Sequence, residues 1–557
     1  MRARRTPSLF ACLLSISACY GSPYSKPVDG AAGGGGAGHG GGTGSGAGGG
    51  AGTSGNATGA GGSAGIDASG AGGDAGVGGG AGTASRAGTG GGAGAVAGTS
   101  GSDGAADAPS PAPGTVLWAR STSSVFLLGV AEASTGVVVT GDLAGPADLG
   151  GGLLTPKSAT DIAIAEYGIA NGSYVASTRF GNSTPAGTGS VGAGFLRSIG
   201  PGGAPIVFGV DTCDPAGTPA CNQIDLGQGL SAPGGGPGTD GYVGRYSIVN
   251  GTPAWLIRLS GPGNDKILAA TTSGPANSIF VGAWYDQDTV LSSGSNSLSF
   301  TNAGSRDVLI FQADTYTGTL EATSTIATAA LEDIGGIVWD GANVVATGRF
   351  NGKTTIGTRT FTSRGDDAWV AKLTPTGAPV WATALGGSGD DSTSQVVVDA
   401  AGDIYLAGTV GGTATFGTFQ VGGAGGSDVF VAKLKGTNGS VIWANSLGSS
   451  ANDSAADLAI NLSSDLLLAA DVSGPVTSSG PAFGAQDALF ASFDADGNRR
   501  WTKVLGTVGT DYAWRVASGS DGFYALYDPG ADIGNNVEGV PIQGAAQPAG
   551  VLIKIAP

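Results

Sequence analysis

Five aspartates that recur at matched places between residues 265 and 511 are the residues best placed to do chemistry. Four stand six residues after a leucine and the fifth occupies a like place in another unit, giving the set Asp265, Asp333, Asp391, Asp453 and Asp511. Convergent carboxylates could form a calcium site, because hard cations take several oxygen ligands. The alternative is turn chemistry, since Asp side chains accept backbone N–H bonds in tight, Gly-rich turns. We favour the turn interpretation and keep calcium as the alternative.

Catalysis by these acids is less well supported. A hydrolytic carboxylate pair needs two acids in unlike environments, whereas repeated acids begin in similar ones. The only histidine, His39, lies in a Gly-rich segment, so the rest of the sequence lacks the commonest general base. We therefore expect no catalytic residue and no cofactor other than the calcium alternative. A formal net charge of −17 also opposes nucleic-acid binding, which requires a basic surface.

The tryptophans fall into two groups. Four recur once per repeated unit, which favours packing between units over ligand stacking: Trp255, Trp381, Trp443 and Trp501. Trp284, Trp339 and Trp514 do not follow that rule. They lie in or near Val/Ile/Leu-rich segments and are the better candidates for lining a pocket.

A repeated unit of about 60 residues must position these side chains. Its clearest copy, DAWVAKLTPTGAPVWATALGGSGDD, begins at Asp367, and further copies begin at Asp428 and Asp487. Each unit also holds a hairpin, such as SQVVVDAAGDIYLAGTV from Ser394, whose Val/Ile/Leu runs and Gly/Asp turn are typical of β-strands. Seven four-stranded units of this kind predict an all-β fold, a seven-bladed β-propeller.

The two ends of the repeat region complete each other. The strand TVLWARS around Trp118 precedes the first unit, and a strand of the D-x-x-V-A type, AGVLIKI, is left over at the other end. In one shared blade they would close the ring and leave no exposed sheet edge. We therefore expect Val116–Ala119 to pair with Val551–Ile555. An open solenoid would need atypical caps rather than complementary fragments.

These repeats resemble those of bacterial proteins described as seven-bladed β-propeller (SBBP) repeat proteins. The matching residues run from Asp367 to Gly408 and comprise the D-x-x-V-A-K-L strand, the W-A strand, the G-G-x-G-D-D turn and the V-D-x-x-G-D-I-Y-L-A-G hairpin. The resemblance covers the fourth to sixth units well and decays in the first two. It implies the fold and no activity.

The beginning of the chain resembles a bacterial lipoprotein signal. Several arginines precede a short apolar run, which ends in Ile16-Ser17-Ala18-Cys19. This last pattern resembles the lipobox, which implies that residues 1–19 are a signal peptide and that Cys19 becomes the lipidated N-terminus. The next residue is Tyr20 rather than Asp. By the same resemblance, that favours the outer membrane of the cell envelope.

The remaining sequence divides into a tether and a folded domain. Residues 20–113 are dominated by Gly and Ala, and no aromatic residue lies between Tyr24 and Trp118. Such a segment buries too little apolar surface to offset chain entropy, so we expect a disordered linker. Residues 114–557 are then the propeller.

Two cysteines remain in this domain, and the chemistry they suggest is structural. In an exported protein, Cys213 and Cys221 are expected to form a disulfide. We expect a surface-exposed, lipid-anchored envelope protein that acts as a non-catalytic binding or scaffold module for an unknown protein or glycan. The alternative is a polysaccharide-binding or polysaccharide-active protein that uses an acidic and aromatic site on one face of the propeller.

Overall fold

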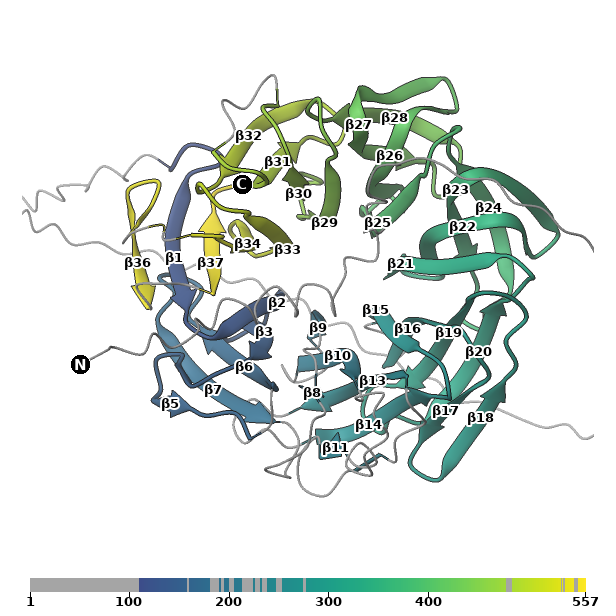
Figure 1. Cartoon of the computed structure of the whole chain (residues 1–557), viewed down its shortest axis with the longest axis horizontal. Coiled ribbons are helices and arrows are strands. Elements are labelled where there is room, and N and C mark those ends of the chain that lie inside the picture. Colours follow the sequence, from purple (N-terminus) through teal and green to yellow (C-terminus); the bar gives the residue numbers. More distant parts are fainter. Residues whose placement is uncertain are drawn as a thin grey trace, which may run out of the picture. The chain divides into compact units, whose positions relative to one another are not determined.

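The computed structural model describes residues 110–157, 160–180, 190–191, 195–199, 205–212, 224–225, 231–232, 238–246, 253–273, 277–476, 483–531, 533, 536–544 and 549–557. Every regular element in these residues is a β-strand, and seven four-stranded blades form a ring (Figure 1). The predicted all-β, seven-bladed propeller is confirmed. In the described part of the chain, no helix is long and apolar enough to span a membrane.

The first three blades contain the following strands, from the centre of the ring outward. Blade one is β2 (Val125–Glu132), β3 (Val137–Leu143), β6 (Asp161–Tyr167) and β7 (Tyr174–Phe180). Blade two is β9 (Phe195–Ile199), β10 (Pro205–Thr212), β13 (Thr239–Tyr246) and β14 (Pro253–Ser260), with β8 (Ser190–Val191) also on β10. Blade three is β15 (Asp265–Ser273), β16 (Ser278–Tyr285), β19 (Asp307–Asp314) and β20 (Leu320–Ile326).

The next three blades repeat this order. Blade four is β21 (Leu331–Trp339), β22 (Val344–Ile356), β23 (Arg359–Leu373) and β24 (Pro379–Leu385). Blade five is β25 (Ser392–Val398), β26 (Ile404–Phe416), β27 (Phe419–Leu434) and β28 (Val441–Leu447). Blade six is β29 (Ser454–Ile460), β30 (Leu466–Val472), β31 (Asp487–Phe493) and β32 (Arg499–Leu505).

Blade seven closes the ring with both ends of the repeat region. It consists of β33 (Tyr512–Ser518), β34 (Phe523–Asp528), β37 (Gly550–Ile555) and β1 (Val116–Thr122). The last two strands are antiparallel, with Val116 opposite Ile555 and Thr122 opposite Gly550. The expected pairing of the terminal strands is therefore confirmed, and it is visible where β1 lies beside β37 in Figure 1.

The connection between the second and third strands of a blade carries extra hairpins. In blade three, β17 (Thr289–Ser293) and β18 (Asn296–Phe300) extend the sheet of blade two through β14. In blade seven, β35 (Asn536–Val537) and β36 (Val540–Gly544) lie outside β1. Two short ladders complete the described strands: β4 (Ala147–Asp148) with β5 (Leu153–Leu154), and β11 (Ile224–Asp225) with β12 (Ser231–Ala232). Cys213 and Cys221 lie outside the described residues, as do Cys19 and residues 20–109 of the expected tether.

The middle strands of each blade are hydrophobic because neighbouring blades cover both of their faces. Every residue of β16, sequence SIFVGAWY, is buried, as is every residue of β31, sequence DALFASF. Outer strands such as β32 are largely exposed or half-buried. Continuous apolar runs therefore mark the second and third strands, much as they mark strands of a sheet that is buried on both sides.

The repeated tryptophans join each blade to the next. Four indole N–H groups donate to a backbone carbonyl of the following blade at 2.8 to 3.1 Å, from Trp118, Trp255, Trp381 and Trp443. A glycine with positive φ lies against the ring in each case, for example Gly439 against Trp381. The interpretation of the repeated Trp as packing between blades is confirmed for Trp255, Trp381 and Trp443, and Trp118 packs in the same way. The ring of Trp501 lies against Gly114.

Candidate functional site

Three of the five predicted acids bind backbone amides at the junction between two blades. The Oδ2 atom of Asp391 accepts a hydrogen bond from the N–H of Gly387 at 2.6 Å, and its Oδ1 accepts one from Gly411 at 3.0 Å. Gly387 follows the outer strand of blade four, whereas Gly411 lies within the second strand of blade five. Asp453 and Asp511 make the same two kinds of bond. All three side chains are buried, and burial raises the pKa of each carboxyl.

The fourth and fifth predicted acids differ from these three. Asp265 begins β15 and is buried, and burial raises the pKa of its carboxyl to about 7. Asp333 is displaced by one residue, because Glu332 holds the equivalent place. The N–H of Glu332 donates to the carbonyl of Arg306 at 2.9 Å, as the N–H of Asp391 does to Asp366. Our alignment of Asp333 with the other acids is therefore corrected. Glu332 lies six residues after Ile326, which stands where the other units have leucine.

We call Asp265, Glu332, Asp391, Asp453 and Asp511 the turn acids. Each lies near a second acid on the third strand of the preceding blade, and we call these the facing acids: Asp240, Asp307, Asp367, Asp428 and Asp487. All of them are buried except Asp367, which is half-buried. Asp428 and Asp487 each accept a backbone N–H bond through Oδ2, from Ala424 and Phe483. Their Oδ1 atoms are buried without a hydrogen-bond partner in the described part of the chain.

The acids are not gathered into one metal-binding group. In the ranges that the structure describes, no three side chains of His, Cys, Asp or Glu form a group that could hold a metal ion. The turn acids instead occupy five successive junctions, from blades two and three to blades six and seven.

The junction of blades three and four departs from this repeated pattern. In each blade the residue after the turn acid pairs with a residue of the second strand. In blades five, six and seven these pairs contain no Lys or Arg: Ser392–Thr409, Ser454–Asp471 and Tyr512–Asp528. In blades three and four each pair contains a cation: Lys266–Trp284 and Asp333–Arg349. The residue before the facing acid is likewise Arg306 in blade three and Ser427 in blade five. Three cations and a tryptophan thus occupy positions that are small and neutral in blade five.

Two of these cations, Lys266 and Arg306, lie over the ring of Trp284. The ring is buried, and the guanidinium carbon of Arg306 lies 3.7 Å from the ring centre. The Nζ atom of Lys266 lies 5.5 Å from the same centre. Both distances are within the range of cation–π attraction. Burial lowers the pKa of Lys266, and the charge of Arg306 lowers it further.

Two carboxylates hold the arginines in place. The Oδ2 atom of Asp333 lies 2.7 Å from Nη1 of Arg306 and 3.5 Å from Nη2 of Arg349. Arg349 also pairs with Asp366, whose Oδ1 accepts a hydrogen bond from Asn351 at 2.7 Å. The arginine side chains remain 24% and 18% exposed, whereas that of Asp333 is 4% exposed. The cations are therefore oriented and still reachable from solvent.

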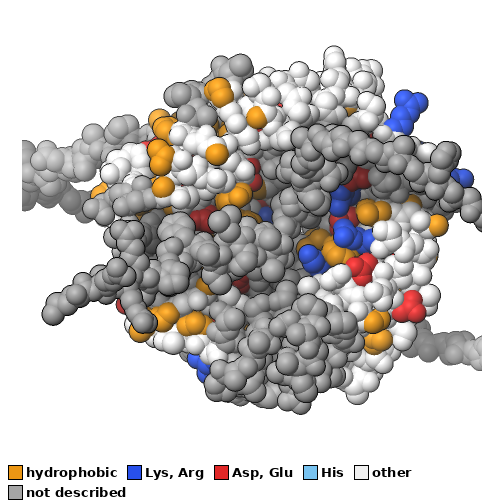
Figure 2. Space-filling view, in the orientation of Figure 1, with side chains coloured by type: hydrophobic (Ala, Val, Ile, Leu, Met, Phe, Trp, Pro, Cys, Tyr) orange, Lys and Arg blue, Asp and Glu red, His pale blue; other side chains and the backbone are white. Residues whose placement is uncertain are grey.

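We call Lys266, Arg306 and Arg349 the basic cluster. Figure 2 shows Lys and Arg side chains gathered near the centre of one face, beside acidic and hydrophobic ones, in the region where β15 and β21 lie in Figure 1. The cluster brings together three of the 25 Lys and Arg residues of a chain whose formal net charge is −17. Its chemistry is the binding of anions, because arginine and lysine offer charge-assisted hydrogen bonds to carboxylate, sulfate or phosphate oxygens.

Other blades carry acids at the position of Trp284. Burial raises the pKa of Asp471 to about 7 and that of Asp528 to about 8, the latter with help from the charge of Asp511. Trp514 lies near this group, with its ring centre 5.9 Å from that of Tyr512. Trp339, the third exceptional tryptophan, stacks on Phe280 at 5.2 Å and is half-buried.

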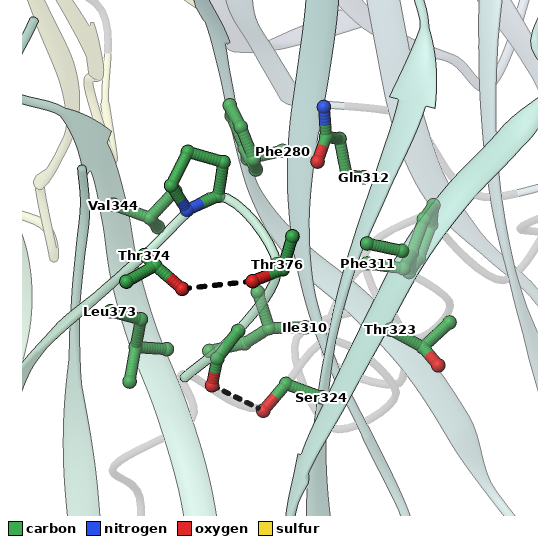
Figure 3. A pocket seen from close by; sticks show the side chains of 13 residues that line it. Phe280, Ile310, Phe311, Gln312, Thr323, Ser324, Val344, Leu373, Thr374 and Thr376 are labelled. Atoms are coloured by element: carbon green, nitrogen blue, oxygen red, sulfur yellow. Dashed lines mark hydrogen bonds between the residues drawn. The ribbon is translucent and has the colours of Figure 1, made fainter. Parts of the chain in front are cut away.

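Two cavities lie elsewhere. The first, between blades three and four, is lined by Phe280, Val344 and the turn that carries Thr374 and Thr376 (Figure 3). Its free volume of about 10 Å³ is roughly that of one water molecule. The second, of about 490 Å³, lies between the end of β32 and the segment around Val537. It is large enough for a small ligand, and its walls combine apolar side chains such as Phe483 and Ile533 with the polar side chains of Thr507, Asn536 and Glu538.

Comparison with known proteins gives similarity of fold only. No protein-family model matches the sequence, and no curated protein matches it. Among solved structures, a quinohemoprotein alcohol dehydrogenase from Comamonas testosteroni is 10% identical, with a TM-score of 0.36 and 79% of this chain and 76% of that chain covered. For quinohemoprotein alcohol dehydrogenase ADHIIG from Pseudomonas putida HK5 the values are 10%, 0.35, 77% and 66%, so this chain spans about two thirds of that protein. A leech intramolecular trans-sialidase is 10% identical, with a TM-score of 0.31 and coverages of 74% and 65%. These likenesses assign no activity to this chain.

The sequence singled out four of the five turn acids, named Asp333 in place of Glu332, and missed the basic cluster. Lys266, Arg306 and Arg349 lie on three segments that are far apart in the chain, so no local motif joins them. Aligning the repeats could have found them, because the equivalent positions of blade five hold Ser or Thr.

Proposed function

We propose that this protein is a non-catalytic binding module of the bacterial cell envelope that takes its ligand at the basic cluster. The observation that carries the proposal is the broken symmetry at blades three and four. A side chain that serves only the ring is expected in every blade, whereas Lys266, Trp284 and Arg306 occur once. Cations that remain partly accessible to solvent on a rigid scaffold are typical of binding sites.

The acids near this cluster favour binding over catalysis. Asp333 and Asp366 are paired with arginines, an arrangement that suits them to orienting cations rather than to transferring protons. A general acid or base would need a pKa near the working pH and access to the substrate.

The site can be tested by a screen of glycans and purified envelope components against the full-length protein. We expect a ligand that is recovered chemically unchanged and whose binding is lost in Arg306→Gln. A matched control is Lys435→Gln, which removes one positive charge from an ion pair in blade five. A ligand that binds both variants equally well lies elsewhere, and that outcome would refute the proposed site.

Membrane anchoring belongs to the same proposal. The lipobox-like Ile16-Ser17-Ala18-Cys19 supports a lipid on Cys19, and the Gly/Ala-rich residues 20–113 suit a flexible tether. The propeller would then be held at the outer membrane, away from the lipid surface. Replacing Cys19 with Ser should release the protein from the membrane fraction, and unchanged partition into detergent would contradict the anchor. The D-x-x-V-A-K-L and W-A strands likewise support a relationship with SBBP repeat proteins.

A polysaccharide-active protein is the second candidate, favoured by one observation. Asp471 and Asp528 have pKa values raised to about 7 and about 8, and Tyr512 pairs with Asp528 across two strands. A protonated carboxyl beside aromatic rings is a possible general acid. Degradation of an acidic or neutral polysaccharide by the purified protein, abolished in Asp528→Asn but not in Arg306→Gln, would establish this function in place of the first.

A further inference from the structure

We propose that the basic cluster binds the carboxylate or sulfate groups of an acidic polysaccharide. This inference rests on the proposed function as a binding module and adds the class of ligand. It follows from three properties of the cluster: a cation without a counter-ion, a fixed arrangement of donors, and a surround that selects against densely charged ligands.

Lys266 is the cation without a counter-ion. In the described part of the protein no carboxylate lies within ion-pair distance of its Nζ atom, although Asp286 and Asp333 are near enough to affect its charge. The side chain is half-buried between Trp284 and Arg306. Placing a half-buried ammonium beside a guanidinium is unfavourable, and the lowered pKa of Lys266 expresses that cost. A bound anion would offset this unfavourable interaction between the two cations, because each cation would gain a neighbour of opposite charge.

The donors of Arg306 are arranged before any ligand arrives. One of its five N–H groups bonds Asp333, and the described residues offer no hydrogen-bond partner to the others. Trp284 on one side and Asp333 on another fix the plane of the guanidinium. Arg349 is fixed in the same way by Asp333 and Asp366. Little side-chain freedom remains to be lost on binding, which is the usual benefit of a preorganised site.

The surrounding acids decide between kinds of anion. Asp286, Asp333 and Asp366 lie beside the cations, and the whole chain is acidic. A nucleic acid or a polyacidic peptide brings closely spaced charges, which these carboxylates and the net charge of −17 would repel. A sugar acid brings one charge per ring together with hydroxyl groups. The hydroxyls can donate to the carboxylates while the anion accepts from Lys266 and Arg306, so both halves of the cluster are satisfied.

The test measures binding of the full-length protein to four polymers of similar length: polygalacturonate, a dextran sulfated at no more than one position per ring, neutral dextran and poly-glutamate. We expect saturable binding of polygalacturonate, the sulfated dextran or both, weakened by added salt, and no binding of neutral dextran. Lys266→Gln and Arg306→Gln should each weaken binding about tenfold or more, as expected for loss of a close charge contact. Lys435→Gln should leave it within about twofold, because that charge is in another blade.

Charge-conserving variants guard against loss of structure. Lys266→Arg and Arg306→Lys should bind more tightly than the corresponding Gln variants, and all variants should keep the melting temperature of the parent within a few degrees. Equal loss of binding in Lys435→Gln and in the cluster variants would overturn the proposal, because attraction would then be diffuse. So would equal binding of poly-glutamate through the same residues.

The proposed function and the ligand class fail in different ways. If a neutral glycan or a protein binds and Arg306→Gln abolishes that binding, the binding function stands and the anionic class is wrong. If none of the four polymers and nothing in the wider screen binds at this face, both fail.

Discussion

Two blade junctions built from the same repeat carry different side chains, and the difference distinguishes residues that maintain the fold from residues that could bind a ligand. At the junction of blades five and six, Asp453 bonds two backbone amides and faces Asp428 across Gly448. The adjacent residues Ser427 and Ser454 are small and neutral, and Ser454 pairs with Asp471. At the junction of blades three and four, Glu332 holds the equivalent turn, and the neighbouring positions carry Asp333 and Arg306.

This comparison teaches that recurrence and departure carry different information in a repeat protein. A residue found in every blade answers a need that every blade has, such as closing a turn or joining two sheets. A residue found in only one blade is not required to build the ring, so we attribute its presence to the binding of a ligand. By this reasoning the turn acids are structural and the basic cluster is the place to look for a ligand.

The largest effect is expected from breaking the ring on which both junctions depend. Deleting residues 549–557 removes β37, which pairs with β34 on one side and with β1 on the other. Because a propeller without a complete last blade has open sheet edges, the whole domain should lose its cooperative unfolding transition. Thermal unfolding followed by circular dichroism checks this. A truncated protein that melts like the parent would show that closure contributes little.

A methyl group should distinguish the two junctions directly. A Cβ on Gly448 would lie 1.7 Å from Oδ1 of Asp428, so Gly448→Ala must displace the chain at the junction of blades five and six. We expect a loss of about 1–3 kcal/mol in the free energy of unfolding, the usual cost of overpacking. The equivalent residue at the other junction is Ala327, which is exposed.

The matched control is therefore Ala327→Gly, which should cost at most about 1 kcal/mol through the entropy of the unfolded chain. Denaturant unfolding compares the two variants. Equal destabilisation would mean that the close approach of Gly448 to Asp428 does not explain the repeated glycine.

Much of the fold was predictable because it depends on features that repeat. The Asp367, Asp428 and Asp487 strands and the Trp strands set the unit, and the orphan strands at the two ends predicted closure before any contact was known. Single positions were harder. Asp333 was aligned one residue out of place because Glu332 and Asp333 are adjacent acids, and only hydrogen bonding to Arg306 and the strand register separate them.

The proximity of each turn acid to its facing acid also could not be predicted from the sequence. Asp428 and Asp453 were both visible as repeated residues, but they belong to different blades, and their proximity comes from the angle at which one sheet packs on the next. The basic cluster was missed for the same reason, since Arg306 and Arg349 come from blades three and four.

Stability should depend on the turn acids more than on Asp333. In Asp453→Asn one carboxylate oxygen becomes an amide group that cannot accept the bond from Ser449 or Ser473, so we expect a loss of about 1–2 kcal/mol. In Asp333→Asn the arginines keep access to solvent, and the cost should be at most about 1 kcal/mol. Chemical denaturation of both variants measures the difference. A reversed order would contradict the division between a structural and a functional junction.

Stability should also fall as the pH rises above 5. Burial raises the pKa of Asp265 to about 7 and that of Asp307 and Asp367 to about 6. Because these values exceed the ordinary value of 3.8, the stability linked to their protonated forms is complete below pH 4 and is lost as the pH rises through 6 to 7.

Melting temperatures at pH 5, 6, 7 and 8 test this dependence. The double variant Asp307→Asn, Asp367→Asn should flatten the decline, whereas Asp496→Asn, a change in an exposed turn, is the control. A parent protein that is most stable at pH 8 would show that the buried acids remain ionised in the fold and are stabilised by contacts other than those described.

The smallest effect is expected from calcium. Each of Asp391, Asp453 and Asp511 already uses both carboxylate oxygens for backbone amides, and the facing acid offers one further oxygen. A calcium ion takes six to eight oxygens, so a junction would have to break its own hydrogen bonds to supply them. We therefore expect the melting temperature to be the same in chelator and in 1 mM calcium. A site with a Kd of about 10 μM would instead stabilise the fold by about 2.7 kcal/mol under that condition, which is readily measured. Such a rise in stability, lost in Asp453→Asn and kept in Asp333→Asn, would show that the repeated junctions bind calcium. Repeated residues could then no longer be assigned a purely structural role, and the reason for choosing the basic cluster as the ligand site would be lost.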